Sequence, residues 1–269
     1  MDRTPLKFGF SPCPNDTFSF HAWVEGLVVG PDVTSQISDI ETLNQSAETG
    51  EAQLTKLSVA ALGRARRDYA LLRAGGAGGY GLGPIVVTKT KEKVAGRVAV
   101  PGVRTTASLL LRLIGDFETV PMPFHEIEHA VLSDQVDCGV LIHEGRFTYA
   151  KKGLRLLADL GAMWEARMRS PVPLGAIAIR RDLIPKYATA ATLAIRASVD
   201  HAIKNPLMSR DFVEQHAREM SRGVVEQHIR AYVNNFTREI DERAVELLLA
   251  WGERTGIYSP MPQKLSIFA

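Results

Sequence analysis

Residues 6–18 read LKFGFSPCPNDTF, a short apolar run followed by a polar turn and the beginning of a helical stretch. The apolar run, residues 6–10, has the length and composition of a buried strand. Helical character begins at Phe18, and Asn15 or Asp16 is the expected N-cap because both side chains can accept a bond from a helix N–H group. This segment predicts a strand that leads into a helix.

The same pattern recurs along the chain. Residues 53–57 (QLTKL) are followed by Ser58, residues 97–100 are followed by a turn and a new start at Thr105, and residues 138–142 end at His143. Strands that alternate with helices are typical of α/β layers. We therefore expect an α/β protein with largely parallel sheets.

Polar residues gather where these strands end. In parallel sheets ligands bind outside the carboxyl ends of the strands, so we expect these residues to line a crevice. Each alone is also a good helix cap, and they form a site only if the strand ends converge. The residues are Asn15, Asp16, Lys56, Ser58, Thr105, Thr106 and His143.

Two further strands suggest two domains. The segments 83–89 and 173–180 are apolar, and each is followed by charged residues. If both cross between domains, residues 89–173 form an inserted α/β domain, and residues 1–88 and 174–269 form the other. We expect a clamshell with a two-strand hinge and the active site in its cleft. The C-terminal region is expected to be helical, with helices at Ala188–Ile203, Asp211–Met220 and Arg243–Trp251.

Composition excludes several classes of function. The 269 residues contain 32 Lys and Arg against 30 Asp and Glu, a net charge of +2 that does not suit a nucleic-acid surface. No apolar window approaches the roughly 20 residues of a membrane span, and no signal segment precedes residue 6. The distant Cys13 and Cys138 fit free thiols in a reducing compartment. We expect a cytoplasmic protein with a small-molecule partner, and its oligomeric state does not follow from the sequence.

Two short segments match motifs that bind a dinucleotide or a metal ion in other proteins. Residues 76–81, GAGGYG, spell the glycine pattern of dinucleotide-binding folds, but an apolar strand rather than a helix follows them. We expect a flexible loop over 75–83. Residues 125–129, HEIEH, match the zinc-peptidase motif, yet Phe124, Ile127 and Val131 form an apolar stripe that gives this helix a structural role. We expect its histidines on an exposed face and no bound metal.

His143 differs from the other histidines. It ends an apolar strand and precedes a short polar turn, where an imidazole with a pKa near about 6.5 can act as a general base. His21, His201, His216 and His228 lie in helical stretches without sequence neighbours that suggest a site, so we expect them at the surface or at the edge of the core.

Seven segments share one further property, a resemblance to a single family. They are residues 11–18 (SPCPNDTF), 41–44 (ETLN), 55–58 (TKLS), 142–149 (IHEGRFTY), 161–165, 173–177 and 232–236 (YVNNF). Together they resemble the 1,4-dihydroxy-6-naphthoate synthases, lyases of the futalosine route to menaquinone. The resemblance extends over nearly the whole chain and is weakest after Arg238.

This resemblance implies the two-domain fold of type II periplasmic solute-binding proteins, used by an enzyme that needs no cofactor. It implies cleavage of cyclic dehypoxanthine futalosine to 1,4-dihydroxy-6-naphthoate and dihydroxyacetone. His143 matches the family's proposed base, and Arg104 is a weaker match for a carboxylate partner. The implied substrate-binding residues are Lys56, Leu57, Ser58, Thr105, Thr106, Asn15 and Asp16.

Other functions fit the same fold. A small-carboxylate binding or sensor protein is the main alternative, a chorismate dehydratase-like enzyme is a second, and a zinc hydrolase is a third. Fold alone does not choose among them. If His143 is not the base, Asp16 and Glu144 are the nearest carboxylates in the expected polar loops.

Overall fold

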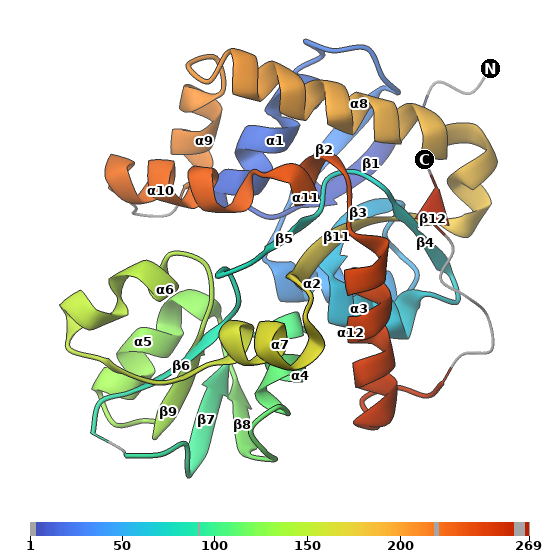
Figure 1. Cartoon of the computed structure of the whole chain (residues 1–269). Coiled ribbons are helices and arrows are strands. Elements are labelled where there is room, and N and C mark those ends of the chain that lie inside the picture. Colours follow the sequence, from blue (N-terminus) through green and yellow to red (C-terminus); the bar gives the residue numbers. More distant parts are fainter. Residues whose placement is uncertain (1–3, 91, 218–220, 261–266, 269) are drawn as a thin grey trace.

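The structure is a computed structural model that describes residues 4–90, 92–217, 221–260 and 267–268. The chain forms two lobes, each with a β-sheet and helices packed against it (Figure 1). The expected α/β clamshell is therefore confirmed. Within the described residues, every helix is too short or too polar to cross a membrane.

The first sheet has the order β12-β4-β11-β3-β1-β2, and β5 pairs with one end of β11. Strands β1, β2 and β3 run parallel, as the strand-then-helix pattern predicts. Its strands are β1 (Leu6–Phe10), β2 (Val33–Ile37), β3 (Leu54–Ser58), β4 (Tyr69–Leu72), β5 (Ala77–Gly79), β11 (Val172–Arg180) and β12 (Ile267–Phe268).

The second sheet has the order β10-β6-β9-β7-β8. Strand β7 is parallel to both of its neighbours, whereas β6 is antiparallel to both of its own. Its strands are β6 (Ile85–Thr88), β7 (Arg97–Val100), β8 (Glu118–Pro121), β9 (Cys138–Leu141) and β10 (Arg155–Asp159).

Both sheets are mixed, so the expectation of largely parallel sheets is wrong. In the first sheet, β11 is antiparallel to β3, β4 and β5. The chain leaves the first sheet after β5, enters the second at β6, and returns through β11. These two passages adjoin the segments expected to connect the lobes.

Helices cover both faces of the first sheet (Figure 1). Helices α1 and α8 pack against each other over one face, and α3 and α12 pack over the opposite face. The helices are α1 (Pro14–Val24), α2 (Ile40–Glu48), α3 (Val59–Ala65), α4 (Thr106–Leu111), α5 (Phe124–Leu132), α6 (Gly145–Thr148), α7 (Leu160–Met168), α8 (Ile184–Lys204), α9 (Arg210–His216), α10 (Arg222–Tyr232), α11 (Asn235–Arg238) and α12 (Glu242–Arg254), with 3₁₀ turns at Tyr149–Lys152 and Arg181–Leu183.

Strand β11 shows how one strand supports two cores. Ile177 and Ile179 pack in the cluster that includes α1 and α8, while Ala176 and Ala178 pack in the cluster that includes α3 and α12. Successive side chains of a strand point to opposite faces, so an apolar run without polar alternation is suited to a sheet covered on both sides. The second of these clusters continues into the other lobe through Trp164.

The glycine-rich segment is more ordered than a flexible loop. Residues Ala77–Gly79 form β5 and pair with β11. A Cβ atom at Gly78 would lie 2.6 Å from the carbonyl oxygen of Val172, which explains glycine at this close approach. The expectation of a loop is wrong at β5, because pairing with β11 satisfies its backbone.

The C-terminal region is helical, as expected. Helices α8 and α12 include the two ranges 188–203 and 243–251. Of the range 211–220, residues 211–216 belong to α9, and residues 218–220 lie outside the described residues. Helix α10 contains His228, which was expected in a helical stretch, although no bounds were predicted for α10 or α11.

Candidate active site

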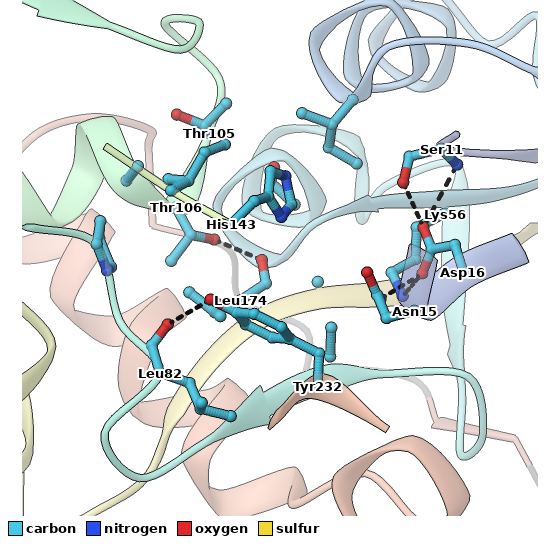
Figure 2. Close-up of a pocket in the computed structure, with 17 residues that line it drawn as sticks. Ser11, Asn15, Asp16, Lys56, Leu82, Thr105, Thr106, His143, Leu174 and Tyr232 are labelled. Atoms are coloured by element: carbon cyan, nitrogen blue, oxygen red, sulfur yellow. Dashed lines mark hydrogen bonds and ion pairs between the residues drawn. The ribbon is translucent and has the colours of Figure 1, made fainter. Parts of the chain in front are cut away.

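One pocket collects the polar residues that follow the strands (Figure 2). The ends of β1, β3 and β9 and the start of α4 meet there, so strand ends from both lobes converge. Of the residues named from sequence, Asn15, Asp16, Lys56, Ser58, Thr105, Thr106 and His143 line it. The other lining residues are Ser11, Ile40, Ala77, Leu82, Pro84, Ala107, Ile142, Leu174, Gly175 and Tyr232.

Helix α1 begins earlier than the sequence indicated. Its N-cap is Cys13, and Pro14 occupies the first helical position, where a missing N–H group costs nothing. Asn15 and Asp16 therefore lie in the first turn, and the expectation that one of them is the N-cap is wrong. Both side chains are buried and point into a hydrogen-bond network.

Asp16 and Lys56 form a buried ion pair at the base of this network. Nζ of Lys56 lies 2.8 Å from Oδ1 of Asp16, and the side chains are 4% and 3% exposed. Asp16 also accepts bonds from Ser11 Oγ at 2.7 Å and from Asn15 Nδ2 at 2.9 Å. Because these bonds already occupy lone pairs of both carboxylate oxygens, few remain to take a proton from a ligand.

Strand β3 supplies two pocket residues and one core residue. Lys56 donates to Asp16 and to the carbonyl of Gly75, which leaves the third N–H of its ammonium group for a ligand. Ser58 Oγ accepts a bond from Asn44 Nδ2 at 3.1 Å, so its own hydrogen is also left to donate. Leu57 is fully buried in the core and is absent from the described lining residues.

Thr105 and Thr106 stand at the start of α4 on the opposite side of the pocket from Asp16 (Figure 2). Thr105 is the N-cap, and its Oγ1 accepts a bond from Ser108 N–H. Thr106 Oγ1 donates to the Leu174 carbonyl at 2.9 Å and accepts from Ala60 N–H at 3.3 Å. Both hydroxyls therefore line the pocket and also make hydrogen bonds that stabilise the start of α4.

Arg104 precedes these threonines but binds elsewhere. Its side chain contacts Glu41, at 3.1 Å, and Glu48, both on α2 of the other lobe. Arg104 is not among the described residues that line the pocket. Its guanidinium instead joins the two lobes beside the site.

His143 follows β9 and occupies a strained position. Its backbone has φ 54°, a left-handed conformation that non-glycine residues adopt mainly at special sites. The ring packs edge-on to Phe124, and Nε2 lies 3.6 Å from Sγ of Cys13. Burial raises the pKa of the Cys13 thiol, which keeps it protonated beside the ring.

The environment of His143 favours a neutral imidazole. Burial lowers its pKa below the ordinary value, and negative charge on neighbouring Glu144 or Asp16 opposes that shift. A neutral imidazole has a free lone pair, which a general base requires. The site thus combines an uncharged histidine with several hydrogen-bond donors around one pocket.

Two residues of α10 lie at the site but were not among the site residues predicted from the sequence. Tyr232 lines the pocket and donates to the Leu82 carbonyl at 3.3 Å, while His228 is fully buried and stacks on His143 with ring centroids 5.5 Å apart. The expectation that His228 lies at the surface or core edge is wrong. Their i, i+4 spacing places both on one helix face, and the resemblance at residues 232–236 was the available signal.

The HEIEH segment lies within α5, and its apolar and charged residues face as expected. Ile127 and Val131 are buried, whereas His125 and His129 are exposed. Glu128 makes an ion pair with Lys152. Among the described residues, no group of three or more His, Cys, Asp or Glu side chains is arranged to hold a metal ion.

Solved structures define the general class. A protein from Archaeoglobus fulgidus superposes with a TM-score of 0.90 at 37% identity, covering 94% of this chain and 98% of that one. A ligand-binding component of an ABC-type import system from Staphylococcus aureus superposes with a TM-score of 0.71 at 11% identity, covering 96% and 94%. A Candida albicans protein described as having the generic periplasmic-binding-protein fold superposes with a TM-score of 0.71 at 10% identity, covering 99% of this chain and 98% of that one, and the fold of this chain is of that class.

Sequence comparison places the chain within that class. A family described as menaquinone biosynthesis matches residues 6–254, and this chain belongs to it. A 1,4-dihydroxy-6-naphthoate synthase from Thermus thermophilus is 44% identical, over 97% of this chain and 99% of its own. One from Streptomyces coelicolor is 46% identical, over 90% and 89%. The resemblance seen in the sequence is confirmed.

Proposed function

We propose that this chain cleaves cyclic dehypoxanthine futalosine to 1,4-dihydroxy-6-naphthoate and dihydroxyacetone in the cytoplasm, without a cofactor. The observation that carries the proposal is the convergence of His143 with polar residues from both lobes on one pocket. The full-length similarity to naphthoate synthases supports it. Residues 1–88 and 174–269 are proposed as one domain and residues 89–173 as the other, with the active site between them.

His143 is the proposed general base. Carbon–carbon cleavage that begins with proton abstraction needs a positioned base and donors that stabilise developing negative charge on oxygen. Burial favours the neutral ring of His143, and the hydrogen of Ser58 Oγ and the third N–H of Lys56 are available donors. We assign these two donors to the ligand's anionic oxygens.

The remaining members of the proposed site act through these groups. Asn15 and Asp16 hold Lys56 in place through the network at the start of α1. Thr105 and Thr106 shape the opposite wall, and Tyr232 adds an aromatic face. Leu57 supports the site from the core rather than through a side-chain contact with the ligand.

A ligand-binding or sensor protein is the second candidate, because solved binding proteins share the fold. Incubation of the purified chain with cyclic dehypoxanthine futalosine separates the two functions. We expect chromatography to show naphthoate and dihydroxyacetone in equal amounts. Saturable binding of the compound without product formation would instead support the binding protein, and turnover of chorismate alone would support a dehydratase.

A further inference from the structure

His228 is oriented by a chain of hydrogen bonds that begins at Asp16. Asn15 Nδ2 donates to Asp16 Oδ1 at 2.9 Å, so the amide oxygen of Asn15 faces the other way. Nε2 of His228 lies 2.9 Å from that oxygen. Because an amide oxygen only accepts, Nε2 of His228 must carry a hydrogen.

The other nitrogen of His228 faces a carboxyl group. Nδ1 lies 3.9 Å from Oε2 of Glu144. Both atoms are buried, and neither has a hydrogen-bond partner among the described residues. With a neutral His228 and an ionised Glu144, two buried acceptor atoms would face each other, which is costly. One additional proton on either group turns this repulsion into attraction and leaves the pair without net charge.

Most neighbouring ionisable groups are already paired or uncharged, so they do not compensate a charge on Glu144. Asp16 is neutralised by Lys56, and Asp159 pairs with Arg146 at 2.6 Å. The Cys13 and Tyr232 pKa values are raised by burial, so both groups stay uncharged. Lys56, Glu144 and Asp39 also act on His143. Burial, and then the neighbouring His143, lower the pKa of His228 well below its ordinary value, so the additional proton belongs to the pair and not to His228 alone.

The pair lies against the proposed base. The rings of His228 and His143 stack at an angle of 30°, and the ring of Tyr232 lies 4.6 Å from that of His228. His143 lines the pocket, whereas His228 is not among the described lining residues. His228 therefore acts on the pocket through neighbouring residues that line it, namely His143, Asn15 and Tyr232.

We propose that His228 and Glu144 together bind one proton at neutral pH, and that His228 is a positioning residue that holds the ring of His143 and the amide of Asn15. The positioning role rests on the proposed function of His143 as the base. A pair without net charge leaves His143 neutral. The Nε2–H group of His228 donates to Asn15 and so fixes the orientation of the amide that donates to Asp16. The titration belongs to the pair rather than to either member.

The charge of the pair is tested by following the titration of His143 by NMR in the product-free protein. The variant Glu144→Gln carries no charge at this position, and the pair in the unmodified protein has no net charge either. We therefore expect the midpoint of the His143 titration to stay unchanged. If Glu144 carries an uncompensated charge, Glu144→Gln lowers that midpoint, and this result overturns the proposal. Because no substrate is needed, the outcome does not depend on the proposed reaction.

The positioning role is tested by His228→Gln, which keeps a donor near Asn15 but removes the stacked ring. We expect kcat to fall by up to about 100-fold, the scale of a misplaced catalytic group, with product affinity unchanged. His21→Gln, which removes another buried imidazole, is the matched control and should keep kcat. Unchanged kcat in folded His228→Gln overturns the positioning role. If this variant fails to fold, the same comparison is made with His228→Asn, whose shorter amide also removes the stacked ring. Lack of turnover by the unmodified protein refutes the proposed function alone.

Discussion

Nζ of Lys56 lies 2.8 Å from Oδ1 of Asp16, and this contact joins β3 to the start of α1 beneath the pocket. The two charges cancel inside the protein, so the site gains donors without gaining net charge. Asp16 is thereby committed to a structural role. This leaves His143 as the pocket residue best able to accept a proton.

Removal of one member of this pair should destabilise the fold. Lys56→Met leaves Asp16 buried and unpaired, and we expect a loss of about 3–5 kcal/mol in the free energy of unfolding, measured by urea denaturation. Lys89→Met breaks an exposed ion pair with Asp134 and should cost about 1 kcal/mol or less. Equal, small losses in both variants would contradict the importance of burial.

Product affinity should depend on Ser58. Ser58→Ala removes a donor proposed for the ligand's carboxylate, and we expect calorimetry to show binding weaker by about 1–3 kcal/mol. Thr105→Ala should weaken binding as well and also lower stability by about 1 kcal/mol, because Thr105 caps α4. Unchanged affinity in both variants would show that these hydroxyls do not bind the ligand.

The lobes should move relative to each other. Arg104 joins the second lobe to α2 through Glu41 and Glu48. We expect product to reduce the radius of gyration in small-angle scattering, since closure around a ligand excludes water. Arg104→Gln should enlarge the product-free form and leave closure by product intact. Identical curves for the unmodified chain with and without product would indicate a rigid protein.

Activity should persist to mildly acidic pH. Burial lowers the pKa of His143, so its neutral, proton-accepting form survives below the ordinary value of about 6.5. We expect kcat/KM to fall on the acidic side with a midpoint below about 6.5, because protonation removes the base. A midpoint above that value, or an identical acidic limb in the residual activity of His143→Gln, would assign the limb to another group.

The sequence predicts the strand ends well because local patterns determine them. The runs that precede Ser11, Ser58 and His143 are strands, and their polar ends meet in one pocket. Strand β11 was expected at 173–180, but its antiparallel direction was not, because an apolar run does not reveal strand direction. His228 was missed because its partner Asn15 is 213 residues away, and only tertiary packing brings them together.

Burial also explains why some matched residues differ in role. Lys56, Leu57 and Ser58 are consecutive in β3, so alternation along the strand turns Leu57 toward the core. Arg104 adjoins Thr105 in sequence, yet its long side chain reaches the carboxylates of α2. A motif identifies the segment of the site, and the backbone decides which of its side chains face the ligand.

The central claim is that His143 is the general base of a carbon–carbon cleavage. The most direct measurement is the turnover of cyclic dehypoxanthine futalosine by His143→Gln, with folding checked by circular dichroism and product affinity by calorimetry. We expect kcat to fall by about 10²–10⁴-fold, the usual contribution of a positioned base, while the fold and most of the affinity remain. A folded His143→Gln variant with full turnover would contradict the account.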